Sequence, residues 1–355
     1  MSLMDRLKAE IRQTGPLTIA QYMAACLHDP QDGYYAARPR LGEAGDFVTA
    51  PLVSQMFGEL IGLWCAQAWA RIGRPARVVW AEVGPGDGTL ALDALRAVRK
   101  AAPDFLAAAE LWLVEPSAPL RTVQLQRLQG GPPPAWAAGL GELPRDAPMI
   151  LVANEVLDCL PARQFVRTER GWAERMVGLD AEGALAFGLS PSPIDRAMPD
   201  AGPGAVVEVS LAQQAFGAEL GALVARQGGA ALLIDYGRAE AGFGDTLQAL
   251  KEHRKVPPLA TPGEADLTVH ADFPAVLGAA GAEGANVSPI LTQAAFLRRL
   301  GIEARAEALA RARPDKADAI ARQLERLIGA DQMGALFKAA AIHAPGMTPP
   351  GFEDG

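Results

Sequence analysis

Apolar residues recur at helical spacing over 2–13, 18–27 and 53–73, and this pattern predicts three amphipathic helices in the first part of the chain. Ser2 precedes the first helix and is suited to be its N-cap. Between the second and third helices, residues 32–51 are polar and punctuated by glycine. Such a long irregular stretch indicates a segment that is either functional or mobile.

Short apolar runs then alternate with helical patterns, which is the signature of a doubly wound α/β sheet. Predicted helices cover 117–129, 210–227, 271–280, 292–300 and 303–330. Predicted strands cover 77–83, 110–115, 148–154, 206–209 and 230–235, with a short strand within 135–143 and a last edge strand over 337–342.

Two stretches depart from this alternation. Residues 162–189 alternate apolar and polar positions and predict a small antiparallel meander, whereas 238–266 has few periodic apolar positions and predicts a long loop. The resulting division has six parts. They are 1–60 (N-terminal helices and lid loop), 61–161 (first half of a Rossmann core), 162–203 (meander insertion), 204–236 (second half of the core), 237–290 (substrate- or partner-side insertion) and 291–355 (C-terminal helices and edge strand).

Composition restricts the classes of partner. The net charge of −8 gives no general attraction to nucleic acid and suits a basic partner. The three cysteines are far apart, and the four histidines lack metal-ligand spacing, so neither a disulfide framework nor a metal site is expected. The N-terminus resembles no signal or transit peptide, and no apolar run is long enough to span a bilayer. These features predict a cytoplasmic protein, and a homodimer stays open.

A glycine turn follows the strand over 77–83. Glycines at 84, 86 and 88 follow Glu82, which gives the E-x-G-x-G-x-G pattern typical of S-adenosyl-L-methionine (SAM) methyltransferases. Bare backbone lets the amino-acid part of SAM approach closely, and a carboxylate can accept from its ammonium group. NAD fits less well because a dinucleotide turn has G-x-G-x-x-G spacing, and a turn without ligand is the simpler alternative. The predicted SAM contacts here are Glu82, Gly84, Pro85, Gly86, Gly88 and Thr89.

Two further segments extend the predicted cofactor site. Glu115 ends the strand over 110–115, where an acidic residue binds ribose hydroxyls in nucleotide sites of this fold. Asp46 and Thr49 lie in the stretch 45–51, which is suited to form a lid or to contact the SAM carboxylate. The alternative for that stretch is turn chemistry and a helix N-cap.

Asn154, Glu155 and Asp158 follow the strand over 148–154 and are expected at the same sheet edge as the glycine turn. Carboxylates there can hold a guanidinium group bidentately and aim its nitrogen at a methyl donor. The alternative is that they cap a following helix. The groups 235–237 and 245–248 also supply polar side chains, either for a substrate pocket or for turns, and His270 is a weak candidate base.

Taken together, these segments resemble the MidA family over residues ~15 to ~345. The resemblance rests on 45–51, 82–90, 114–117, 154–161, 235–237, 245–248, 262–268 and 291–297. Mitochondrial members are protein arginine methyltransferases needed for assembly of respiratory complex I, and they modify a core subunit of that complex. The resemblance implies a seven-stranded SAM-methyltransferase sheet with added helices and an inserted substrate-side region, and it places Gly84, Gly86, Gly88 and Glu115 at SAM. Without a mitochondrial presequence, this chain looks like a bacterial-type member.

The hypothesis from sequence is therefore a SAM-dependent methyltransferase that acts on a protein arginine, with a complex I subunit as a candidate substrate. Two other classes stay open. A small-molecule methyltransferase predicts an enclosed apolar pocket. A non-catalytic assembly chaperone predicts that the region 238–290 binds a partner, although such a protein has no need of the glycine turn and Glu115.

Overall fold

The computed structural model describes residues 1–37, 49–191 and 198–353. A central sheet runs in the order β15-β17-β10-β5-β2-β3-β4. The five strands from β10 to β4 are parallel to one another, whereas β17 is antiparallel to its neighbours β10 and β15. This arrangement confirms the Rossmann-like α/β prediction. The strands are β2 (Val78–Val83), β3 (Ala109–Val114), β4 (Ala135–Ala137), β5 (Met149–Asn154), β10 (Gly229–Arg238), β15 (Asn286–Val287) and β17 (Phe337–His343), with β14 (Ala271–Asp272) beside β10 and β16 (Leu291–Thr292) beside β17.

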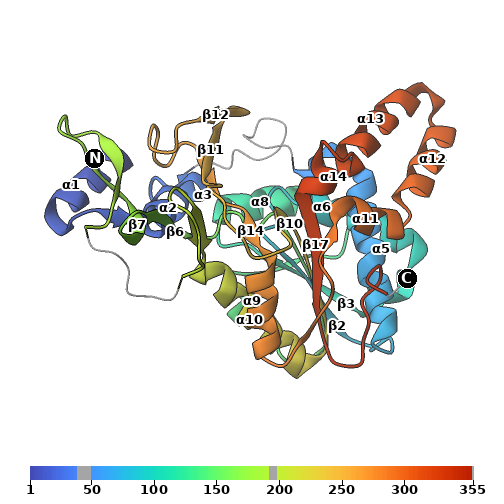
Figure 1. Cartoon of the computed structure of the whole chain (residues 1–355). Helices are drawn as coiled ribbons and strands as arrows, with labels where there is room; N and C mark the ends of the chain where they lie inside the picture. The colour runs from blue at the N-terminus through green and yellow to red at the C-terminus, as the bar shows by residue number, and fades with distance from the viewer. Residues whose placement is uncertain (38–48, 192–197, 354–355) are drawn as a thin grey trace.

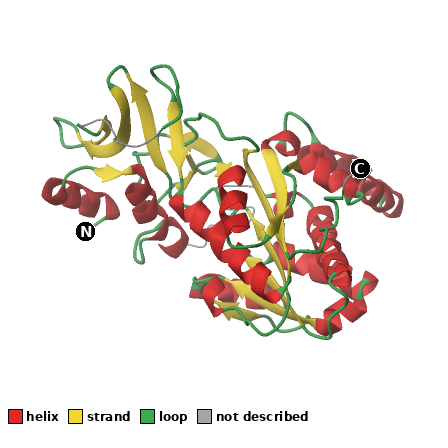
Figure 2. Ribbon diagram, turned by 60° about the horizontal axis from the view of Figure 1, so that its bottom comes forward, coloured by secondary structure: helices red, strands yellow, loops and turns green. Residues whose placement is uncertain are grey.

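Helices cover both faces of this sheet, as Figures 1 and 2 show. Side chains of β2 alternate between the two layers: Val78 and Trp80 belong to one apolar core, and Val79 and Ala81 to the other. The first core lies under α5 (Gln55–Arg71), α6 (Thr89–Ala101), α7 (Pro103–Ala108), α11 (Gln293–Arg299), α12 (Ile302–Ala312), α13 (Ala317–Ile328) and α14 (Met333–Leu336), and the second under α9 (Leu211–Gln227) and α10 (Phe273–Ala282). At the β3–β4 side lie α8 (Ala118–Arg127) and the short 3₁₀ turn Leu140–Glu142.

A smaller lobe joins segments that are far apart in sequence (Figure 1). Leu7 and Tyr22 from the N-terminal helices share one core with Val177 and Leu267 from later insertions. Its elements are α1 (Leu3–Thr14), β1 (Leu17–Thr18), α2 (Ile19–His28), α3 (Tyr34–Ala37), the sheet of β6 (Arg163–Thr168), β7 (Gly171–Leu179), β8 (Leu185–Leu189) and β9 (Val206–Val209), and the sheet of β11 (Gln248–Lys251), β12 (Arg254–Val256) and β13 (Asp266–Thr268). A further short helix, α4 (Ala50–Val53), leads into α5.

The N-terminal helices begin where the sequence predicts. Ser2 and Asp5 form a reciprocal capping box on α1, and Thr18 and Gln21 form another on α2. Each box satisfies backbone N–H groups that the first helical turn leaves without partners. Local sequence alone therefore determines these helix starts.

Three predictions of secondary structure, in separate parts of the chain, were wrong. The stretch 238–266 is not a long loop, because β11 pairs with both β12 and β13. The helix over 303–330 is two helices, interrupted at Pro314, which has no N–H to continue the first one. Strand 206–209 pairs with β6 of the meander and so does not belong to the Rossmann core. Within the described ranges, no helix is both long and apolar enough to cross a membrane.

Candidate active site

A cavity of about 490 Å³ opens where the carboxyl ends of β2, β3 and β5 meet the smaller lobe. Ligands of open α/β sheets bind at this edge. The cavity brings together most of the side chains predicted from sequence: Thr49, Glu82, Gly84, Pro85, Gly86, Thr89, Glu115, Asn154, Glu155 and Asp158 line it. Gly88 lies in the same turn without lining the cavity, and Asp46 lies outside the described residues.

The glycine turn has a backbone that only glycine adopts without strain. Gly84, Gly86 and Gly88 have φ of 62°, 55° and 84°. At Gly84 a Cβ atom would also meet Cγ2 of Val156 at 3.1 Å. Gly84 therefore leaves this wall of the cavity bare where the turn after β5 packs against it.

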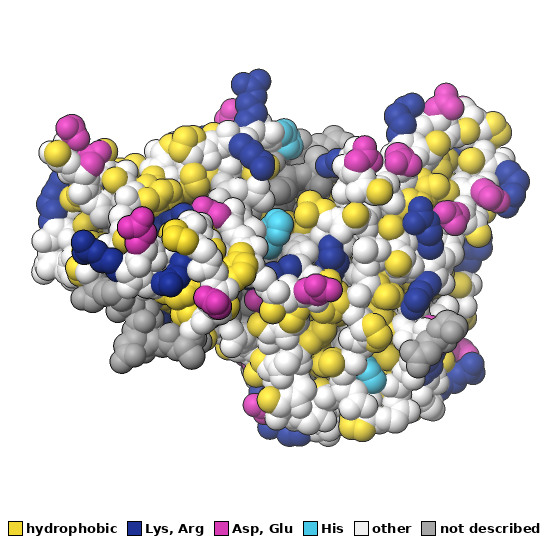
Figure 3. Space-filling model, viewed as in Figure 1, with side chains coloured by type: hydrophobic (Ala, Val, Ile, Leu, Met, Phe, Trp, Pro, Cys, Tyr) yellow, Lys and Arg dark blue, Asp and Glu magenta, His cyan; other side chains and the backbone are white. Residues whose placement is uncertain are grey.

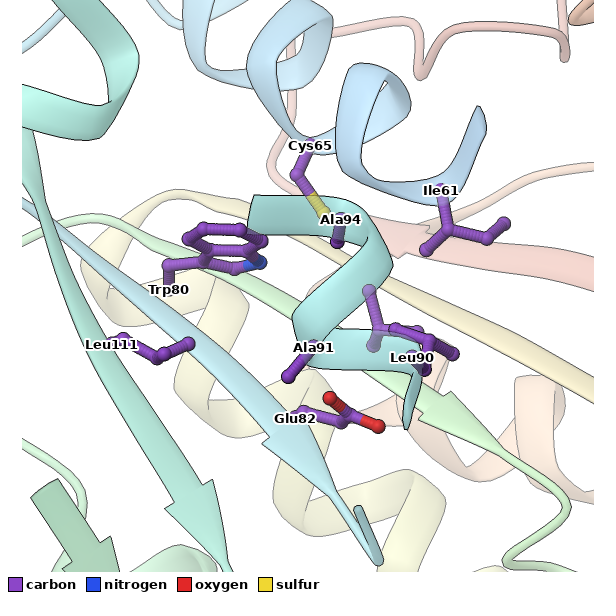
Figure 4. Close-up of a pocket in the computed structure, with 9 residues that line it drawn as sticks. Ile61, Cys65, Trp80, Glu82, Leu90, Ala91, Ala94 and Leu111 are labelled. Carbon is purple, nitrogen blue, oxygen red and sulfur yellow. The ribbon is translucent and has the colours of Figure 1, made fainter. Parts of the chain in front are cut away.

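Glu82 is the buried acid of this turn. It lies on β2 beneath α6, where Figure 4 shows its carboxylate below Leu90 and Ala91, next to an internal cavity of about 10 Å³. Burial raises the pKa of Glu82 to about 8. Its Oε2 atom and Oδ1 of Asn154 are buried acceptors without a hydrogen-bond partner among the described residues. Two such acceptors beside a cavity suit a ligand that donates, such as an ammonium group.

Replacement of Glu82 by Gln should make stability less dependent on pH. The pKa is raised on folding, so the protonated acid stabilises the fold at low pH, and this contribution is lost as pH rises through about 8. The contribution is complete only below about pH 4.5, where the carboxyl is protonated in both states, and it falls steadily up to about pH 8. At pH 9 we expect Glu82→Gln to unfold above the wild-type temperature, by a difference on the order of a few kcal/mol in unfolding free energy, and at pH 4 close to it. Thermal unfolding at both pH values measures this, and equal pH slopes for the two proteins would contradict it.

Glu115 is fixed by a small hydrogen-bond network. Its Oε1 atom accepts from Ser117 N at 2.8 Å, and its Oε2 atom accepts from Nε2 of Gln124 at 3.3 Å. The same Gln124 nitrogen donates to the carbonyl of Gly86 at 2.8 Å, while its Oε1 atom accepts from Trp136. Gln124, which the sequence analysis did not single out, thus connects the glycine turn to the predicted ribose-binding carboxylate.

Thr89 and Thr49 line the cavity in structural settings. The Thr89 hydroxyl donates to Asp87 at 2.7 Å and accepts from Arg127 at 2.6 Å, so it is occupied at the start of α6. Thr49 precedes α4, and the next backbone N–H, of Ala50, donates to Oε1 of Glu155 at 3.1 Å. The described end of the stretch 45–51 therefore holds a predicted catalytic side chain in place.

Glu155 and Asp158 lie in a turn, and no helix follows β5, so the capping alternative is wrong. Glu155 has a left-handed backbone with φ of 55°, which is strained for a side chain of this size. Burial, and next the charge of Asp158, raise the pKa of Glu155 to about 8. Asp158 accepts from the Tyr236 hydroxyl at 2.6 Å, and burial raises its pKa above the usual range.

Other polar groups considered from sequence are structural. Asp235 is fully buried, and its Oδ2 atom accepts from the backbone N–H groups of Leu157 and Asp158 at 2.8 and 3.2 Å, which shapes the turn that carries them. Asp245 pairs with Arg175 at 2.8 Å on the meander. Neither Asp235, Asp245 nor His270 lines the cavity.

The sequence analysis missed the far wall of the cavity. His28, Tyr34, Tyr35 and Asp266 come from the smaller lobe, and Phe216 and Glu219 come from α9. No local pattern marks these residues, because long-range packing of α2, α3 and β13 brings them to the sheet edge. Two signals pointed to this wall. One is the polar, glycine-rich stretch that contains Tyr34 and Tyr35, and the other is the assignment of 237–290, which contains Asp266, to the substrate side.

Acidic side chains predominate among the charged residues that line the cavity. Seven carboxylates and no Lys or Arg are among the described residues that line it: Glu82, Asp87, Glu115, Glu155, Asp158, Glu219 and Asp266. By contrast, the outer face in Figure 3 carries acidic and basic side chains intermixed. The described part of the chain contains no cluster of side chains suited to hold a metal ion. A cationic ligand matches this interior.

Comparison with known proteins shows that the chain is similar to methyltransferases. A family model described as S-adenosyl-L-methionine-dependent methyltransferase matches residues 60–291. The mitochondrial protein arginine methyltransferase NDUFAF7 of Danio rerio is 33% identical over 364 residues, covering 95% of this chain and 86% of that protein. The homologue from Drosophila melanogaster is 34% identical over 379 residues, with coverage of 96% and 84%.

Solved structures agree in fold. A crystal structure of a Burkholderia thailandensis protein bound to S-adenosyl-homocysteine has a TM-score of 0.85 at 32% identity, covering 99% of this chain and 93% of that one. A native structure of a protein from the same superfamily and organism has a TM-score of 0.82 at 30% identity, covering 99% and 92%.

Proposed function

The chain belongs to this family of S-adenosyl-L-methionine-dependent methyltransferases, and on that premise we propose that it methylates an arginine side chain of a protein substrate. The acidic interior of the cavity is the observation that carries the proposal, because a guanidinium group is cationic and presents a planar fork of donors. The relatives named protein arginine methyltransferase support the same acceptor.

The residues on the Rossmann side of the cavity fit SAM. Glu82 and Asn154 offer buried acceptors for its ammonium group, the bare backbone of Gly84 and Gly86 allows close approach, and Glu115 is suited to the ribose hydroxyls. When bound, SAM supplies a methyl group attached to a positively charged sulfur, and this sulfur is the leaving group, which becomes a neutral thioether.

Glu155 and Asp158 bind the acceptor in this reaction, and Glu155 also accepts a proton. As carboxylates they hold the guanidinium and limit its rotation, so that one nitrogen faces the methyl donor. As the new carbon–nitrogen bond forms and the carbon–sulfur bond breaks, that nitrogen loses a proton. Glu155, whose pKa of about 8 is close to physiological pH, is suited to accept it.

Methyl transfer should rise with pH below about pH 8. Both carboxylates must be ionised to bind a cation, and their raised pKa values mean that at lower pH the free site is protonated. With saturating SAM, kcat/KM for the acceptor should increase up to about pH 8 and then level off. Glu155→Gln should remove the upper part of this rise. A rate profile that is flat or falls between pH 6 and pH 8 would refute this assignment.

A protein acceptor and a small-molecule acceptor are separated by one fractionation. SAM with a labelled methyl group is incubated with this protein and an extract of cells that lack it, and the extract is then divided by size. We expect the label in the macromolecular fraction. Label confined to the low-mass fraction would favour the small-molecule alternative, and no transfer despite SAM binding would favour the chaperone.

As the first acceptor to test we propose a core subunit of respiratory complex I, on the basis of the family resemblance. Purified complex I, from cells lacking this protein, is the direct probe. The cytoplasmic location and a homodimer stay predictions.

A further inference from the structure

Asp266 lines the active-site cavity although it belongs to the insertion, far along the chain from the glycine turn. It begins β13, whose neighbour Leu267 is buried in the core that the smaller lobe shares with α2. The next residues return to the Rossmann side, where Val269 N donates to the carbonyl of Asp158 at 3.0 Å. Asp266 is therefore held from both sides, and its side chain is more than nine-tenths buried.

Aromatic side chains stand next to this carboxylate. The Tyr35 hydroxyl donates to Oδ1 of Asp266 at 3.1 Å, and the Tyr35 ring stacks on His28 with centroids 5.8 Å apart. Tyr34 meets the Tyr35 ring edge-on at 5.2 Å. Burial, and next the charge of Asp266, raise the pKa of Tyr35 well above its usual range. Asp158 lines the same cavity as this pair.

A second observation points to a hydrogen-bond-donating ligand in this cavity. Glu82, itself more than nine-tenths buried, lines the same cavity with an Oε2 atom that has no partner among the described residues. In the proposed function, SAM binds against the wall that carries Glu82. The wall with Asp266 and Tyr35 faces the remaining ligand of the reaction, the acceptor.

We propose that Asp266 and Tyr35 form a positioning subsite for the acceptor, which binds the substrate guanidinium together with Glu155 and Asp158. The inference rests on the proposed function and extends it to a residue outside the Rossmann core. A guanidinium matches this wall in two ways, since its edge donates to carboxylates and its face stacks on aromatic rings. An alkylammonium group lacks the flat face and the fork, so the subsite selects arginine over lysine.

Small probes test the subsite without knowledge of the protein substrate. Protein saturated with S-adenosyl-homocysteine is titrated with n-propylguanidinium, n-butylammonium and n-propylurea by calorimetry. We expect n-propylguanidinium to bind most tightly. Asp266→Asn should weaken it about tenfold, Tyr35→Phe less, and Asp266→Glu should recover part of the loss.

Controls separate a local effect from damage to the fold. Glu264→Gln removes a charge two residues away that pairs with Lys251 at the surface, and it should change binding by less than about twofold. S-adenosyl-homocysteine affinity should stay unchanged in all variants. Equal binding of n-propylguanidinium to wild type and Asp266→Asn would overturn the subsite and leave the arginine proposal intact. Binding of n-propylurea or n-butylammonium as tight as that of n-propylguanidinium, or binding of none of the probes, would contradict the arginine proposal itself.

Discussion

Gly86→Val should abolish SAM binding, with a loss of affinity of about 100-fold or more. Two effects combine. The backbone at Gly86 has φ of 55°, which a β-branched residue adopts only with strain of about 1–2 kcal/mol. The new side chain also starts from a wall of the cavity where the ligand has to approach bare backbone. Calorimetric titration with SAM and S-adenosyl-homocysteine measures the loss directly.

Gly73→Val is the matched control. Gly73 also has a positive φ, of 89°, but it is exposed after α5 and a Cβ atom there would meet nothing within 4 Å. This variant should lose stability from backbone strain and keep its affinity for SAM. A Gly86→Val protein that stays folded and binds SAM as tightly as Gly73→Val would show that the glycine turn is not the cofactor site.

Glu155→Gln should reduce kcat/KM for the acceptor by about 100-fold or more while SAM affinity changes little. The amide keeps the shape of the side chain and removes both its charge and its capacity to accept a proton. Glu110→Gln makes the same chemical change at the opposite end of the sheet, where Glu110 pairs with Arg77 at the surface, and it should leave the rate unchanged. Steady-state kinetics at saturating SAM distinguishes the two.

Glu155→Gly adds a structural argument to this prediction. Glycine adopts the left-handed backbone of position 155 without strain, and this gain offsets the lost hydrogen bond from Ala50 N, so this variant should unfold close to the wild-type temperature. It should nevertheless be inactive. A strained residue that lowers stability and is required for activity is the pattern of a functional site. Full activity in Glu155→Gly would instead make Glu155 a structural residue.

The sequence predicted the parts of the fold that depend on local signals. Capping residues such as Ser2 and Thr18 mark helix starts, and the alternation of buried strands and helices marks the Rossmann core. The small sheet of β11, β12 and β13 was missed because its strands have only three or four residues, too few for a periodic pattern. Pro314 is a helix-breaking residue in the sequence, but helical periodicity continues on both sides of it, so one helix was predicted where there are two.

Of the candidate site, only the residues on the Rossmann side of the cavity were predicted. Side chains at the carboxyl ends of strands can be placed from sequence, because parallel strands end at one edge of the sheet. Tyr35 and Asp266 could not be placed in this way, since contacts between separate insertions bring them to the cavity. Glu155 has a positive φ between two long-range contacts, the hydrogen bond of its N–H to Ile234 and the turn held by Asp235, and residue types do not reveal these contacts.

The most direct test of the arginine proposal is the position of the transferred methyl group. Proteins labelled from SAM with an isotopically marked methyl group are digested, and fragment-ion mass spectrometry locates the label in each peptide, with Glu155→Gln enzyme as the control. We predict label on an arginine side-chain nitrogen, absent with Glu155→Gln. Label on lysine, on a carboxylate or on another side chain, with every arginine unlabelled, would contradict it.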